Sequence, residues 1–197
     1  MVVIHMVRHI LLGAVAPPLV WLAASVLPQP RSLFVRTSLG RLVTNPMTSW
    51  LAGTLTVIGW HVPAAFDLAE RSALWNDVQD LSFLATGLLF WWPVVRPWPA
   101  AERLPRAAIP LYLFAATLPC DALSAFLVFC DRAVYGQHLA EHRNFSMSAL
   151  ADQQTAGALM WVSITFLYLI PALVMTVQTL SPGRPTTDYT ASEFSSP

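Results

Sequence analysis

Five apolar segments, each long enough to cross a lipid bilayer as a helix, divide this chain of 197 residues. A transmembrane helix needs about 20 apolar residues, whereas a strand of a membrane barrel needs only about 10. The segments are too long and too uniformly apolar for barrel strands, and they run approximately over 3–27, 47–69, 78–95, 107–130 and 152–178. The sequence therefore predicts an all-α polytopic membrane helical bundle with five transmembrane helices.

The composition is typical of a membrane protein and gives no sign of a nucleic-acid partner. Hydrophobic residues make up 55% of the chain and charged residues 11%, with 11 basic side chains against 11 acidic ones. This balance provides no net positive charge for phosphate groups. We expect one helical domain over 1–180 in contact with the lipid bilayer. Residues 181–197 contain too few large apolar side chains to pack and are predicted to be a disordered tail.

The first apolar segment resembles a signal peptide in outline, because Arg8 precedes an apolar stretch that ends in small residues. The stretch is long for a signal peptide, however, and Pro17 and Pro18 interrupt it. Histidines also stand at its start. We therefore expect a retained transmembrane helix.

The placement of arginine predicts the orientation, since the chain contains no lysine. Cytoplasmic loops of membrane proteins carry an excess of positive charge. The loops after the first and third segments each contain three arginines, with at most one acid: Arg31, Arg36 and Arg41 in one, and Arg96, Arg103, Arg106 and Glu102 in the other. We expect both loops in the cytoplasm, which places the N-terminus outside and the C-terminal tail in the cytoplasm.

With this orientation, the ionisable residues within the segments fall in the outer half of the membrane. They are His5, His9, His61, Asp80, Asp121 and Asp152. Such groups cost several kcal/mol at the centre of a bilayer and persist mainly where they pair, meet water or bind a ligand. The pattern predicts a shared site that faces outward.

The histidines favour a metal ion at this site. His5 and His9 are four residues apart and so lie on one face of a helix, and His61 could add a third nitrogen from a neighbouring helix. Met6 and Met160 offer soft sulfur, and the three aspartates offer oxygen ligands or partners that orient the imidazole rings. Neutral imidazole with soft sulfur nearby favours copper over magnesium or calcium.

Simpler interpretations of these residues stay open. Either histidine at the mouth of the first helix could be an interfacial residue with its polar edge in water. Asp121 could be a buried acid that is satisfied by the hydroxyl of Ser124 or by water.

The two cysteines add little to this prediction. Cys120 and Cys130 are ten residues apart on one predicted helix, about 15 Å along its axis, which is too far for a disulfide. Cys120 is either a soft ligand beside Asp121 or a small buried thiol of the core.

Four motifs resemble, in the same order, those of the CtaG-type assembly factors of cytochrome c oxidase. They are HMVRHILLGAVAPPL, WHVPAAFDLA, LSFLATGLLFWWPV and DQQTAGALMWV, and they cover the chain to about residue 180. The resemblance implies a multi-pass protein of the bacterial inner (plasma) membrane that assists oxidase assembly, with copper delivery or insertion as its task and oxidase subunits as its partners. By position, the histidine motifs match His5, His9 and His61, and the acidic glutamine motif matches Asp152 and Gln153.

The chain departs from that family pattern in two respects. The third helix of the family opens with a pair of histidines, and the corresponding positions here are Asn76 and Asp80. Family members also commonly carry further helices upstream of the first motif.

No residues predict bond-making catalysis, because no histidine and acid flank an evident nucleophile and no phosphate-binding loop is present. We therefore expect a binding protein and not an enzyme. Two alternatives stay open: a haem-binding redox protein with His9 and His61 as axial ligands, and a metal-free scaffold that holds oxidase subunits through its lipid-facing surface and the outer loop around His138 and His142. The sequence also leaves open whether two copies form a homodimer.

Overall fold

The computed structural model describes residues 2–26, 37–95, 104–135 and 148–181. These ranges are helical and contain no strand, which confirms the predicted all-α class. The elements are α1 (Val2–Ile10), η1 (Leu11–Val15), α2 (Ala16–Ser25), α3 (Ser38–Thr44), α4 (Pro46–His61), α5 (Pro63–Arg71), α6 (Ala73–Val95), η3 (Arg106–Ala108), α7 (Ile109–Phe129) and α9 (Ala149–Leu180). The predicted tail, apart from Ser181, lies outside the described residues, as do His138 and His142.

Four stretches within the described ranges are long and apolar enough to cross a membrane. They are Val2–Ser25, Ala73–Val95, Arg106–Phe129 and Ala149–Leu180. Large apolar side chains are exposed along each of them, for example Leu81, Leu111 and Phe166. Exposed apolar surface of this extent is what a lipid environment requires.

The predicted second span, 47–69, is two helices and not one. α4 ends at His61 and α5 begins at Pro63, because proline has no N–H to continue the ladder and the preceding Val62 is extended, with φ −64° and ψ 130°. α4 has 16 residues, fewer than the roughly 20 that a full span needs. The expected count of five spans is therefore confirmed for four.

The first span is continuous but locally widened. Pro17 and Pro18 cannot donate hydrogen bonds to the preceding turn, and the five residues Leu11–Val15 form a π-helical turn in which the Ala16 N–H reaches the Leu11 carbonyl. The indole of Trp21 then donates to the Leu88 carbonyl at 2.8 Å, which ties α2 to α6.

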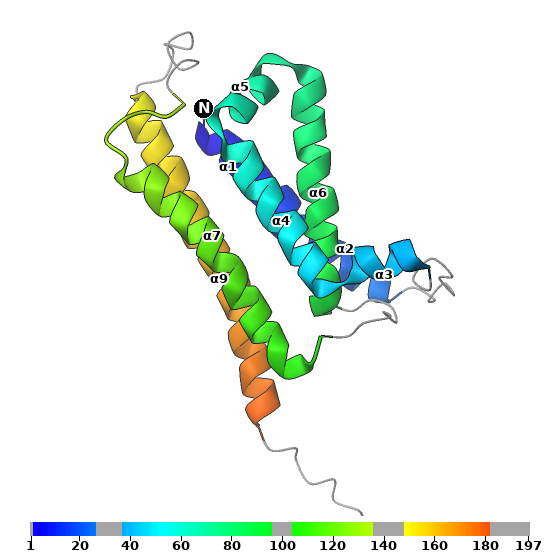
Figure 1. Cartoon of the computed structure of the whole chain (residues 1–197). Helices are drawn as coiled ribbons and strands as arrows, with labels where there is room; N and C mark the ends of the chain where they lie inside the picture. Colours follow the sequence, from blue (N-terminus) through cyan, green and yellow to red (C-terminus); the bar gives the residue numbers. More distant parts are fainter. Residues whose placement is uncertain (1, 27–36, 96–103, 136–147, 182–197) are drawn as a thin grey trace, which may run out of the picture.

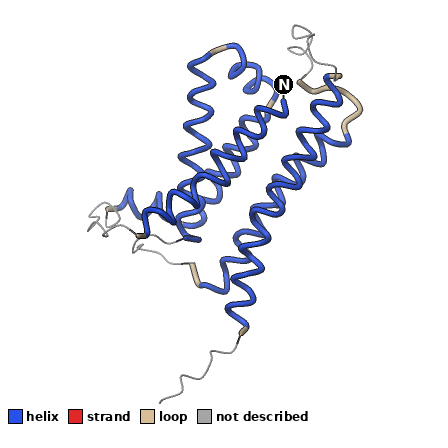
Figure 2. The backbone as a smooth tube through the Cα atoms, turned by 180° about the vertical axis from the view of Figure 1, so that it is seen from behind, coloured by secondary structure: helices blue, strands red, loops and turns tan. Residues whose placement is uncertain are grey.

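The helices form two groups that share one end. α7 and α9 make a long antiparallel hairpin, and α1, α4 and α6 lie together beside it (Figures 1 and 2). The N-terminus, α5, the start of α6, the end of α7 and the start of α9 gather at the upper end in Figure 1. His5 and His9 of α1 and His61 at the end of α4 lie at this end.

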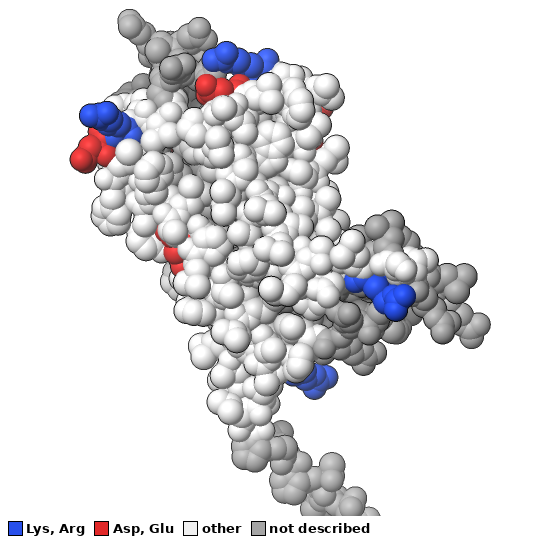
Figure 3. Space-filling view, viewed as in Figure 1, with Lys and Arg blue, Asp and Glu red and all other residues white. Residues whose placement is uncertain are grey.

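Charged side chains differ between the two ends of the molecule. On the face seen in Figure 3, acids and arginines occur together at the upper end, whereas the lower end shows arginine without acid. Arg41 and Arg106 are exposed members of the loops that were predicted to be cytoplasmic.

Two glycines set the distance between the first span and α6. A Cβ atom added at Gly87 would lie 2.6 Å from the Gly13 carbonyl oxygen and 2.8 Å from Cγ of Pro17. Only hydrogen fits there, so α6 approaches the backbone of η1 directly. This contact holds Phe83, one turn earlier on α6, against the first span.

Substitution of Gly87 by alanine should lower the free energy of unfolding by about 1–3 kcal/mol, because the added methyl group must push α6 away from η1. Reversible unfolding in detergent micelles measures the effect. Gly59→Ala is the matched control, since nothing lies within 4 Å of its added Cβ. Equal stability of the two variants would contradict this packing.

Candidate metal centre

The structure brings the three predicted histidines together at the upper end of the bundle. His5 and His9 lie one turn apart on α1, and His61 is the last residue of α4. The ring centroids of His5 and His9 are 4.0 Å apart, and those of His9 and His61 are 6.3 Å apart. Their exposed fractions are 7%, 5% and 6%, so the rings point into the protein and away from lipid.

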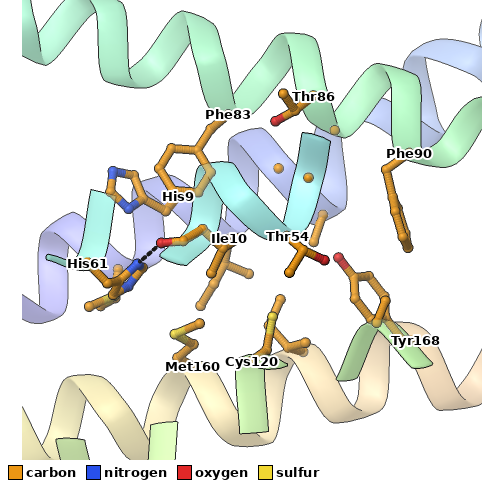
Figure 4. Close-up of a pocket in the computed structure, with 18 residues that line it drawn as sticks. His9, Ile10, Thr54, His61, Phe83, Thr86, Phe90, Cys120, Met160 and Tyr168 are labelled. Atoms are coloured by element: carbon orange, nitrogen blue, oxygen red, sulfur yellow. Dashed lines mark hydrogen bonds between the residues drawn. The ribbon is translucent and has the colours of Figure 1, made fainter. Parts of the chain in front are cut away.

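His61 is held from both sides of its ring. Nδ1 lies 2.7 Å from the Val57 carbonyl oxygen, a contact drawn as a dashed line in Figure 4. Nε2 lies 3.3 Å from Sδ of Met6, which is buried on α1. Neutral imidazole carries one N–H, and the carbonyl is the stronger acceptor. With the proton on Nδ1, the Nε2 lone pair faces the sulfur.

His5 repeats this arrangement on the neighbouring helix. Its Nδ1 lies 3.4 Å from a carboxylate oxygen of Glu70 at the end of α5, whereas its buried Nε2 has no hydrogen-bond partner. A carboxylate that accepts from Nδ1 orients the ring and leaves Nε2 free to act as a ligand.

His9 lies between aromatic and amide side chains. Phe83 stacks on its ring with centroids 4.0 Å apart and an interplanar angle of 23°. Neither nitrogen of His9 makes a hydrogen bond of ordinary geometry, although the side chain of Gln79 is close enough to interact with it. Gln79 is itself completely buried, and neither end of its amide has a well-formed hydrogen bond.

The three predicted aspartates have partners other than the histidines. Asp80 pairs with Arg8 at 2.9 Å, and the same guanidinium donates to Asn76 at 2.7 Å. Asp121 accepts from the hydroxyl of Thr165 on α9 at 3.4 Å. Asn76 and Asp80, the positions at which the sequence resemblance implies a pair of histidines, thus both bind an arginine.

Asp152 holds the beginning of the first helix. Its carboxylate accepts hydrogen bonds from the backbone amides of Val2 at 2.7 Å and Val3 at 3.4 Å. Free amides and the positive end of the helix dipole favour a carboxylate at this place. Because His5 follows one turn later, Asp152 positions the histidines through the backbone of α1.

Gln153 performs the equivalent task for the end of α7. Its amide nitrogen donates to the carbonyls of Leu127 and Arg132, each at 3.3 Å, and its oxygen accepts from the Val134 N–H at 2.6 Å. The adjacent Tyr135 then donates its hydroxyl to the His61 carbonyl at 2.8 Å. Burial raises the pKa of Tyr135 to about 12, so this hydroxyl keeps its proton at neutral pH.

Among the residues that the structure describes, no three His, Cys, Asp or Glu side chains are grouped closely enough to hold one ion. The structure does place donor atoms of two predicted ligands close together, Nε2 of His61 and Sδ of Met6, which are 3.3 Å apart. Gln79, Glu70 and Tyr135 were not predicted from the sequence. A spacing of four residues places Gln79 on one face of α6 with Phe83 and Gly87, whereas Tyr135 follows the end of α7 without a periodic pattern.

Comparison with known proteins decides the family. The family model for the cytochrome c oxidase caa3 assembly factor (Caa3_CtaG) matches residues 1–181. The chain belongs to this family. The chain is also 27% identical over 193 residues to an uncharacterized protein of Mycobacterium bovis and, to the same extent, to one of Mycobacterium tuberculosis. These matches cover 88% of this chain and 29% of each relative, and no solved structure matches.

Asp152→Asn should lower the free energy of unfolding of this assembly factor by about 1–2 kcal/mol. The uncharged amide is a weaker acceptor for the two α1 amides and loses the attraction to the helix dipole. Unfolding in micelles, with hydrogen exchange at Val2 and Val3, measures the loss. Asp77→Asn, an exposed acid on α6, serves as the control, and protection at Val2 that is unchanged in Asp152→Asn would refute the role.

Proposed function

We propose that this protein binds a copper ion at the outer end of its bundle and delivers it to cytochrome c oxidase during assembly. His61 and Met6 are the first ligands in this proposal, and His5 and His9 are the neighbouring nitrogens that receive or release the ion. The role in oxidase assembly is inferred from membership of an oxidase assembly-factor family. The choice of copper as the transferred ion is inferred from the chemistry of these side chains.

The contact between His61 and Met6 is the observation that supports copper most strongly. An imidazole lone pair and a thioether sulfur face each other at 3.3 Å, while the other imidazole nitrogen is occupied by the Val57 carbonyl. Both atoms donate electron pairs, and no proton remains to lie between them. A soft ion such as Cu(I) prefers this combination of nitrogen and sulfur.

The remaining histidine nitrogens support the same proposal. Nε2 of His5 and both nitrogens of His9 are buried without a hydrogen bond of ordinary geometry. A buried polar group without a partner costs about 1–3 kcal/mol, and native proteins keep few of them. Each neutral imidazole offers one lone pair, and a metal ion that accepts it offsets part of that cost.

The proposal gives the predicted acids other tasks than metal binding. Asp152 fixes the start of α1, and Asp80 fixes α6 to α1 through Arg8. Asp121 joins α7 to α9 through Thr165. The ligands that remain are neutral donors, and exchange of the ion between them allows its release.

The site faces the outer aqueous side of the bacterial inner membrane in this proposal, and the protein acts without catalysing a reaction. The arginines at the opposite end of the bundle support this orientation, because cytoplasmic ends are enriched in positive charge (Figure 3). Copper would then enter from the compartment in which the oxidase receives it.

Met6→Leu and His61→Gln should each weaken Cu(I) binding by at least about tenfold, because each removes one ligand while it keeps much of the volume. Competition with a Cu(I) chelator, followed by metal analysis, measures the affinity of the purified protein. Met47→Leu is the matched control, since Met47 is 68% exposed.

Joint replacement of His5, His9 and His61 by alanine tests the biological task. Copper stoichiometry and oxidase maturation should both fall. If both remain unchanged, the copper proposal fails. Copurification with oxidase subunits that persists without metal would favour the scaffold alternative, and an intense Soret band in the purified protein would favour haem.

A further inference from the structure

A cavity extends from the histidines into the membrane-spanning part of the bundle. The space free of atoms in and around it is about 670 Å³, a volume that includes open space outside the cavity. The cavity lies between the first span, α4 and α6 on one side and the α7–α9 hairpin on the other (Figure 4). His9 and His61 line one end, and Phe90 and Tyr168 line the other.

Soft sulfur atoms line this cavity from three helices. Met6 comes from α1, Cys120 from α7 and Met160 from α9. Figure 4 shows Cys120 and Met160 on the hairpin wall, with Met160 across the cavity from His61. Cys120 is a free thiol and is buried, as is Met160.

A second observation indicates a ligand in this space. His9 lines the same cavity, is 95% buried, and has no hydrogen bond of ordinary geometry on either nitrogen. Most of the other lining residues are apolar, for example Ile10, Val57 and Ile164. Soft donors surrounded by apolar walls exclude the hard, hydrated ions and suit a dehydrated soft one.

We propose that the Cys120 thiol and the Met160 thioether form a second, deeper site for a soft monovalent ion such as Cu(I), which is reached from the histidine end of the cavity. The deeper site is separate from the histidine ligands, but its role in copper transfer rests on the proposed function.

The charge balance explains why a cysteine is needed at this depth. A bare cation in an apolar cavity within a membrane is costly, and neutral imidazole and thioether ligands leave its charge in place. When Cu(I) binds, the S–H bond of Cys120 breaks and a sulfur–copper bond forms, which gives a neutral thiolate–Cu(I) unit without oxidation or reduction. The displaced proton passes to solvent through the open part of the cavity.

The test uses the full chain, purified in detergent, loaded with Cu(I) under ascorbate and then washed with a chelator. The wild-type protein should retain two copper ions per chain and show the ultraviolet charge-transfer absorption of a thiolate–Cu(I) bond. Cys120→Ser should lose one ion and this absorption. Cys130→Ser, which alters the other free thiol at the end of α7, should keep both.

A second pair of variants keeps the test valid if Cys120→Ser fails to fold. Met160→Leu should weaken the deeper ion by at least about tenfold, whereas Met175→Leu should not, because Met175 packs against the core of the bundle without lining the cavity.

The triple histidine variant separates the two sites. It should lose one ion and retain the thiolate absorption, and if it retains both ions, the histidine proposal fails while the deeper site stands. Wild-type protein without thiolate absorption, or Cys120→Ser and Met160→Leu that both bind copper as the wild type does, would overturn the deeper site.

Discussion

Two adjacent side chains at the start of α9 hold together the end of this bundle that carries the histidines. Asp152 binds the first amides of α1, and Gln153 binds the last carbonyls of α7 and the amide of Val134. Hydrocarbon supplies no hydrogen bonds, so helix ends near the membrane must find such partners within the protein. The two groups of helices meet at one end for this reason.

The position of the histidines follows from these contacts. Asp152 fixes the position of α1 along the bundle, and α1 carries His5, Met6 and His9. Tyr135, which follows the segment bound by Gln153, fixes the end of α4 by its hydrogen bond to the His61 carbonyl. Pro63 contributes as well, because it ends α4 directly after His61. Donors from two helices therefore converge although neither helix alone could bring them together.

Much of this arrangement is visible in the sequence, because it rests on periodicity. The spacing of His5 and His9 predicts a shared helical face, and the lengths of the apolar segments predict four of the described helices to within a few residues, apart from the longer start of α6. The break after His61 has a local signal in Pro63, but the apolar character of the residues around it concealed this signal.

Pairings between distant residues could not be predicted in the same way. The position of Asp80 in the sequence predicts that it lies at the same depth in the membrane as the histidines. Whether its carboxylate then faces a metal ion or Arg8 depends on the rotation of α6 about its axis, and in the structure it faces Arg8. That rotation is set by the contact of Gly87 with Gly13, a matter of three-dimensional packing. Tyr135 lies in a connection whose conformation no periodic pattern describes, so its bond to His61 appears only in the structure.

The most direct test of the proposed copper site is X-ray absorption at the copper edge of the Cu(I)-loaded Cys120→Ser protein, in which no thiolate of the cavity contributes. The account predicts nitrogen neighbours together with one sulfur neighbour, which disappears when Met6→Leu is added. A copper ion surrounded by nitrogen or oxygen alone, or a sulfur neighbour that persists without Met6, would contradict it.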